Sequence, residues 1–518
     1  MMYRRGRHRF RGRRTFSTAP AGSAAGLGQE AGDRSQEVDD QEREAAGRDG
    51  DAASRDIPSP DEGRARGKAA RKVAPRSSHG ELDLPSDRVD PVEQLERQAA
   101  SRLPELIPLR YGRMLVSAFT FYRGAAGIMA QDLSQTPVSG IRVQACGDAH
   151  LSNFGGFAAP DRQLVFDIND FDETLPGPWE WDLKRLAASL EIGGRDRGFG
   201  KKERRQIVTD SVARYRKAMH RFAGMSNLDV FYARTGLPEI AERWGPEAGK
   251  KTWKKAEKNV AKARGKDRLR AFSKLTHVVD GELRIISDPP SVVPFEEITP
   301  ADRLPGLDDR IRAILSNYRE TLSRDRRHLL DSYRYVHAAM KVVGVGSVGT
   351  RCWIVLMIGR DTGDPLFLQV KEAQQSVLEP SQGTSEFSNH GERVVEGQRT
   401  TQSASDIFLG WVRAEGIDQV KRDYYVRQLW DWKGSARVEN MDPRSMAVYG
   451  QICGSVLARA HARTGDRFAI AGYLGNSSNF DQAIARFARA YADQNERDYK
   501  AVLEAADSGR IKVAPSDR

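Results

Sequence analysis

Residues 147–155, GDAHLSNFG, place an aspartate, a histidine and an asparagine in one short stretch between apolar runs. Asp148 and Asn153 follow the pattern D-x-x-x-x-N, which is typical of loops that transfer phosphoryl groups. In such a loop the aspartate orients or deprotonates the attacking hydroxyl, and the asparagine oxygen helps to hold Mg²⁺. We therefore predict that both residues are catalytic and that Asn153 is also a metal ligand. The alternative is a hydrogen-bonded turn between core strands.

A Mg²⁺ ion also needs a hard carboxylate oxygen, and one or two carboxylates are enough when the ion bridges phosphates. The stretch VFDINDFDE offers Asp167, Asp170 and Asp172 near the end of a predicted strand. We predict that Asp170 is the catalytic carboxylate that binds the metal, because it stands where the strand should end and precedes a phenylalanine. The sequence leaves open whether Asp167 or Asp172 takes this place instead.

A glycine turn and a lysine lie far downstream, within 341–373. Gly344, Gly346 and Gly349 form G-x-G-x-x-G between two predicted strands, whereas a dinucleotide-binding turn would open a helix. The next strand, LFLQVKEA, ends with Lys371 after an apolar run. We predict that the turn and Lys371 bind the phosphates of a nucleotide. An ordinary hairpin with an edge lysine is the alternative.

A lysine that grips phosphates is usually held by an acid on a neighbouring helix. The segment HGERVVEGQRTTQSASD is predicted to be helical and follows Lys371. We predict that Glu396 pairs with Lys371 and belongs to the nucleotide site. Glu392 stands one helical turn earlier and is the second candidate.

The order of predicted elements indicates an α+β chain with two lobes. Large apolar residues are sparse in 1–90, which predicts a disordered tail. Residues 91–335 are predicted to form a helical lobe that carries the catalytic and metal-binding loops. We expect 336–435 to be mainly β and to bind nucleotide, and 436–518 to be helices that pack on the helical lobe.

Composition limits the cellular setting. The chain has 518 residues, a formal net charge of +11 and three cysteines, Cys146, Cys352 and Cys453. Such a sparse, odd set gives no disulfide framework and suits a cytoplasmic protein. No apolar run is long enough to span a membrane. The Arg-rich residues 1–16 and the basic stretch 250–275 favour a solvated surface, with nucleic acid as a weak alternative partner.

The motifs together resemble a known superfamily. The segments CGDAHLSNFG and VFDINDFDETLPGPWEWDLKRLA look like the H-G-D-x-H-x-x-N…I-D-F-x-D block of aminoglycoside and choline kinase-like phosphotransferases. Asp148, His150, Asn153, Asp170 and Asp182 fall on the matching places. The resemblance implies a bilobed protein kinase-like fold that uses ATP and Mg²⁺. The motif histidine two positions before the catalytic aspartate is Cys146 here.

The region from about 92 to 505 also resembles the bacterial domain of unknown function 2252 family, through FYRGAA, CGDAHLSNFG, NDFDET, PWEWDLKRLA and RQLWDWKGS. In a kinase the glycine turn and lysine precede the catalytic loop, but here they follow it. The kinase-like resemblance therefore implies a circularly permuted fold. The segment GSVLARAHARTGD resembles the helix that ordinarily enters the catalytic loop, so the cut would fall just after it.

The leading hypothesis is thus an ATP- and Mg-dependent phosphotransferase that acts on a hydroxyl of an unknown acceptor, with a small molecule as the first candidate. Transfer of AMP to a hydroxyl would use the same parts. A protein that binds nucleotide or nucleic acid without catalysis is a further alternative. A metal phosphoesterase fits poorly, because the paired histidines that it needs are missing from the sequence. The sequence leaves open whether 148–170 and 344–396 share one cleft.

Overall fold

The computed structural model describes residues 58–248, 268–342, 344–429 and 434–515, together with positions 254, 258, 261 and 432. The chain divides into two units, 1–57 and 58–518, of which the second is described below. The Arg-rich residues 1–16 and most of the basic stretch 250–275 lie outside the described residues.

The expected disordered tail does not extend through 58–90. Helix α2 (Pro60–Ala70) begins with a capping box in which Glu62 accepts a hydrogen bond from the backbone of Ser59, with Pro60 at the first helical position. It packs on α19 (Arg467–Leu474), where a Cβ on Gly67 would stand 1.9 Å from a backbone oxygen. This contact is made by glycines, so the segment lacks the apolar residues that normally mark a buried helix.

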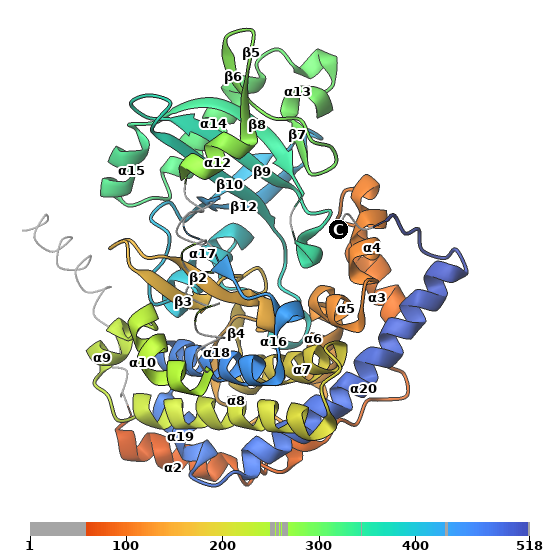
Figure 1. The fold of residues 1–518 in the computed structure, drawn as a ribbon, viewed down its shortest axis with the longest axis vertical. Helices are drawn as coiled ribbons and strands as arrows, with labels where there is room; N and C mark the ends of the chain where they lie inside the picture. The colour runs from red at the N-terminus through yellow and green to blue at the C-terminus, as the bar shows by residue number, and fades with distance from the viewer. Residues whose placement is uncertain are drawn as a thin grey trace, which may run out of the picture. The chain divides into compact units, whose positions relative to one another are not determined.

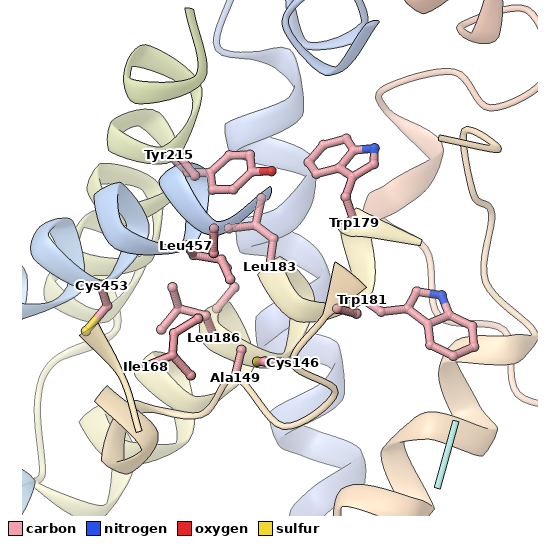
Figure 2. Packing of buried hydrophobic residues seen from close by; sticks show 14 of the residues in the cluster. Cys146, Ala149, Ile168, Trp179, Trp181, Leu183, Leu186, Tyr215, Cys453 and Leu457 are labelled. Carbon is pink, nitrogen blue, oxygen red and sulfur yellow. The ribbon is translucent and has the colours of Figure 1, made fainter. Parts of the chain in front are cut away.

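A helical core surrounds the loop at residues 147–153. Trp179 stacks on Tyr215 with ring centroids 5.6 Å apart, and Leu183, Leu186 and Leu457 pack around them (Figure 2). The long helices here are α7 (Trp179–Asp196), α8 (Lys201–Phe222), α18 (Pro443–Thr464) and α20 (Asn479–Asp507). The shorter ones are α3 (Pro91–Ala99), α4 (Ile107–Met114), α5 (Ala118–Gly124), α6 (Ala126–Ser134), α9 (Asn227–Tyr232) and α10 (Leu237–Ala248).

Two small sheets carry the predicted loop motifs. Strand β1 (Arg142–Ala145) pairs with β4 (Leu175–Pro178). Strands β2 (Phe154–Ala158) and β3 (Leu164–Ile168) form a hairpin, and β13 (Gly434–Ser435) pairs with the outer edge of β2. Cys146 and Ala149, which stand on either side of Gly147 and Asp148, are buried in the helical core (Figure 2).

A six-stranded antiparallel sheet forms the second part of the unit, in the order β11-β12-β10-β9-β8-β7 (Figure 1). Its strands are β7 (Val292–Pro294), β8 (Arg334–Lys341), β9 (Cys352–Ile358), β10 (Pro365–Ala373), β11 (Gly410–Glu415) and β12 (Lys421–Gln428). The predicted strand, glycine turn, strand, turn, strand over 341–373 corresponds to β8, β9 and β10. Helix α17 (His390–Thr401) packs on β10, β11 and β12.

Residues between 268 and 330, which the sequence assigns to the helical lobe, pack on this sheet. Helix α14 (Leu307–Arg319) covers one face through Ile311 and Leu315, which contact Trp353 and Val370 in one apolar cluster. The other face receives α12 (Arg268–Leu275) through a second cluster. The remaining elements are the hairpin β5 (Thr276–Val279) and β6 (Glu282–Ile285), α13 (Phe295–Ile298), α15 (Arg324–Leu330) and α16 (Glu379–Gln382).

The described unit is therefore an α+β fold, as the sequence predicts. Its three cysteines are buried and free. Within the described ranges, no helix has both the length and the apolar character needed to cross a membrane.

Candidate functional site

The β2–β3 hairpin brings the two predicted loops together. Residues 154 and 168 are paired at the open end of this hairpin, and the Asn169 amide donates to the Asn153 carbonyl at 2.8 Å. Because the predicted catalytic loop enters β2 and Asp170 follows β3, both lie at the same end of the hairpin. A glycine is required just before Asp148, since Gly147 has φ +79° and a Cβ there would stand 2.4 Å from the Glu173 carbonyl.

Asp148 is held through one carboxylate oxygen. Arg185 of α7 donates to Oδ1 at 2.8 Å, and the same guanidinium stacks over the ring of Tyr122. The other oxygen, Oδ2, lies 3.6 Å from His150 Nε2, which is beyond hydrogen-bond range. Burial lowers the pKa of His150 to about 3, so this histidine is neutral at neutral pH. The Asp148 Oδ2 atom therefore has a neutral neighbour and is available to a ligand.

Asn153 is oriented by its own loop. Its Nδ2 donates to the Asp148 carbonyl at 2.7 Å. No hydrogen bond from a described residue reaches the Asn153 Oδ1 atom, which leaves the amide oxygen available as a ligand. Such an arrangement suits the predicted role of Asn153 as an oxygen donor to a divalent cation.

Lys371 reaches the same place from the six-stranded sheet. It is paired with Cys352 on one side and Tyr425 on the other, so the three side chains share one face of the sheet. Lys371 Nζ forms an ion pair with Asp172 and lies 3.8 Å from Asp170 Oδ1. Burial lowers the pKa of Lys371, but the two aspartates outweigh this effect and raise it. The segments that contain the loop motifs and the lysine thus meet in the fold.

The three aspartates of the stretch 165–173 have different surroundings. Asp167 is buried on β3, where it pairs with Arg459 and accepts hydrogen bonds from Ser403. Asp172 is bound by Lys371, and Tyr425 donates to its Oδ1 at 2.8 Å. Among the described residues, no hydrogen bond reaches the buried Oδ1 of Asp170. Asp170 is therefore the acid that remains open to a ligand.

Burial, followed by the nearby charge of Asp172, raises the pKa of Asp170 to about 6. A divalent cation would supply the charge that this carboxylate lacks, and Asp170 with Asn153 would provide two oxygen ligands to Mg²⁺. In the described part of the chain, no group of three or more His, Cys, Asp and Glu residues is arranged to hold a metal alone. A site with few protein ligands fits an ion that is also bound by phosphates.

The glycine turn lies beside these acids. Its 3₁₀ segment, Val345–Ser347, contacts α5, and Ser347 Oγ is 3.5 Å from Asp172 Oδ2. At its two ends, Gly344 has open space around it, while the Gly349 carbonyl accepts a hydrogen bond from the Leu103 amide. Gly346 has one near neighbour, the Arg123 carbonyl, 3.5 Å from where its Cβ would stand.

The predicted pairing of Glu396 with Lys371 needs correction. Glu396 forms an ion pair with Arg399 on its own helix, at 2.7 Å. The residue of α17 that faces the acid loop is Arg393, which is buried and donates to the backbone carbonyls of Asp172 and Thr174. Lys371 is instead held by Asp172. Helix α17 therefore positions the acid loop through hydrogen bonds from Arg393 to the loop's backbone carbonyls, and not through a contact with Lys371.

Two further candidate site residues, Tyr425 and Arg427, were not predicted from the sequence. Tyr425 and Arg427 alternate along β12 and share the face of Lys371. Arg427 donates to the Asn169 carbonyl at 3.2 Å and to Gln369 at 3.1 Å, so it joins the sheet to the acid loop. The alternation in DYYVRQ could have predicted this placement, because side chains two residues apart on a strand, such as Tyr425 and Arg427, lie on one face.

Asp182 holds the backbone at the start of the predicted catalytic loop. It accepts hydrogen bonds from the amides of Cys146 and Gly147, and it lies 3.2 Å from His461 Nε2 on α18. The end of this helix touches β1, since the Gln144 amide donates to Thr464 Oγ1. The C-terminus of α18 is thus adjacent to the strand that leads into the loop, although the two are far apart in sequence.

Comparison with known proteins identifies the family predicted from the sequence. No curated protein and no solved structure matches the chain. A family model described as "Uncharacterized protein conserved in bacteria (DUF2252)" matches residues 102–505. Because this match spans most of the chain, the protein belongs to the DUF2252 family.

Proposed function

We propose that this protein is an ATP- and Mg²⁺-dependent phosphotransferase that acts on a hydroxyl group. The observation that carries the proposal is the meeting of Lys371 with the acids at 170 and 172, which come from a distant part of the sequence. A lysine beside a metal-binding acid, a nearby glycine turn and a D-x-x-x-x-N loop are the parts that phosphoryl transfer requires.

Each residue has a distinct role in this proposal. Asp148 orients the acceptor hydroxyl and takes its proton on Oδ2, while Arg185 fixes the other oxygen. The acceptor oxygen bonds to the γ-phosphorus as the bond to the bridging oxygen breaks, and ADP leaves with that electron pair. Lys371 exchanges its contact with Asp172 for a phosphate oxygen. Bound Mg²⁺, held by Asp170 and Asn153, would neutralise charge on the phosphates.

The arrangement of elements supports a permuted kinase-like fold. A glycine turn, a lysine on the third strand of a meander, and a helix packed on the sheet follow the order of a kinase nucleotide lobe. The contact between the end of α18 and β1 also fits a chain that was cut between them. Permutation leaves a site intact when the joined ends are close. The helix acid that pairs with the lysine in kinases has no counterpart at Glu396.

Calorimetric titration with Mg²⁺-ATP tests the proposal. The wild type should bind, and Asp170→Asn and Lys371→Met should each weaken binding at least tenfold. Glu396→Gln is the matched control, since it removes a charge near the sheet whose partner is Arg399, and it should bind like the wild type. Absence of binding in the wild type, with Mg²⁺ or Mn²⁺, would overturn the proposal. If the Asp170 and Lys371 variants bind nucleotide as tightly as the wild type, the nucleotide binds elsewhere.

A further inference from the structure

Arg393, which donates to the carbonyls of Asp172 and Thr174, and four further cations near the candidate site are bound to protein oxygens. Arg185 is bound to Asp148 and Lys371 to Asp172. The other two, Arg102 and Arg427, donate to the backbone carbonyls of residues 348 and 169. These five side chains are thus partly or fully committed to holding the loops in place.

Arg123, in the motif FYRGAA, is different. No hydrogen bond or ion pair with any described residue reaches its guanidinium, and its Nε is buried without a partner. The side chain as a whole is half-buried. A buried N–H without an acceptor is unfavourable, so the Nε of Arg123 lacks a partner that folded proteins usually supply.

Arg123 lies near Asp148, and its carbonyl is also the near neighbour of Gly346 in the glycine turn. It is the penultimate residue of α5 and follows Tyr122. The ring of Tyr122 lies under the Arg185 guanidinium, and the Tyr122 carbonyl accepts a hydrogen bond from that guanidinium at 2.8 Å. Burial lowers the pKa of Arg123, and the charges of Glu439 and Asp148 oppose this only in part. The cations of the sheet, by contrast, face the acids at 170 and 172.

We propose that Arg123 binds an oxyanion, a phosphate or a carboxylate, on the acceptor substrate, so that the acceptor is an anionic hydroxyl compound. This inference rests on the proposed function, because it takes Asp148 as the residue that meets the acceptor hydroxyl. The planar fork of an arginine matches the geometry of both oxyanions. An anion held here would satisfy the unpaired guanidinium and place a neighbouring hydroxyl near Asp148.

The test is calorimetric titration of the full-length protein with inorganic phosphate and, separately, with acetate. The anion that the site takes should bind the wild type, and its affinity should fall at least tenfold in Arg123→Gln. Arg123→Lys, which keeps the charge, should retain part of the binding and guards against loss through misfolding. Arg360→Gln is the matched control, because Arg360 is 83% exposed on a distant hairpin. It should bind like the wild type.

Two results would overturn the inference. One is anion binding that is absent from the wild type or unchanged in Arg123→Gln. The other is a selective loss of affinity for Mg²⁺-AMP-PNP over Mg²⁺-ADP in Arg123→Gln, which would assign Arg123 to the γ-phosphate. Failure of the proposed function gives a different pattern: the wild type would bind no nucleotide, yet Arg123-dependent anion binding would persist. In that case the anion site stands and its assignment to an acceptor falls.

Discussion

Two carboxylate clusters lie within a few residues of each other but are built in opposite ways. At the first, Asp167 and Arg459 are 1% and 2% exposed, and the aspartate also accepts from Ser403. At the second, Asp170 and Asp172 are 34% and 28% exposed, and Lys371 serves both. Both clusters join segments that are distant in sequence, so sequence separation does not distinguish one cluster from the other.

The difference is in how many oxygen atoms are satisfied. Both Asp167 oxygens have donors, from Arg459, Ser403 and the backbone of Ile168. The buried oxygen of Asp170 has none among the described residues, and its pKa is raised to about 6. Removing a buried aspartate whose two oxygens are both satisfied leaves its partners unpaired and destabilises the fold, whereas an unsatisfied acid beside a lysine costs stability and is available to a ligand.

The largest expected effect is at the satisfied cluster. Asp167→Ala should lower the free energy of unfolding by about 3–5 kcal/mol, because it leaves Arg459 buried without its carboxylate. Chemical denaturation monitored by circular dichroism measures this change. Asp161→Ala is the control on the same hairpin and should cost much less stability, since Asp161 is 48% exposed and its ion pair with Arg234 is on the surface. Equal losses in the two variants would remove the contrast between the clusters.

The second expected effect has the opposite sign. The pKa of Asp170 in the folded protein, about 6, exceeds its ordinary value of 3.8, so stability from the protonated form is lost as the pH rises through 6. Asp170→Asn cannot ionise and should raise the melting temperature at pH 7.5 by roughly 1–3 °C. At pH 5 the gain should shrink, because the wild-type carboxyl is then largely protonated. A lower melting temperature at pH 7.5 would mean that Asp170 is a structural partner of Lys371.

The smallest expected effect is at Glu396. Its ion pair with Arg399 joins side chains that are 34% and 35% exposed on one helix. Glu396→Gln should therefore change the free energy of unfolding by less than about 0.5 kcal/mol in thermal or chemical denaturation. A loss well above this value would show that Glu396 has a further partner, and Lys371 would become the first candidate.

The contrast between the clusters also explains what the sequence could predict. Asp148, Asn153 and Lys371 stand at strand ends or in short motifs, where local spacing determines the geometry. The choice among the three aspartates required the register of β3, which ends at Ile168 and turns Asp167 inward. Residue types alone do not carry that information.

Long-range packing accounts for the other differences. Glu392 and Glu396 are one turn apart on α17, and the sequence does not say that Arg393, rather than either acid, faces the loop. In 268–330 the helices pack on the sheet and strand β7 joins its edge, which depends on strand order and not on local propensity.

We propose that the loop acids and Lys371 form one nucleotide site. A crystal structure with Mn²⁺ and AMP-PNP, using the anomalous signal of manganese, tests it most directly. We predict a manganese peak bound to Asp170 and Asn153, with Lys371 Nζ moved from Asp172 to a phosphate oxygen. Manganese and nucleotide bound away from these residues, with Lys371 still on Asp172, would contradict the account.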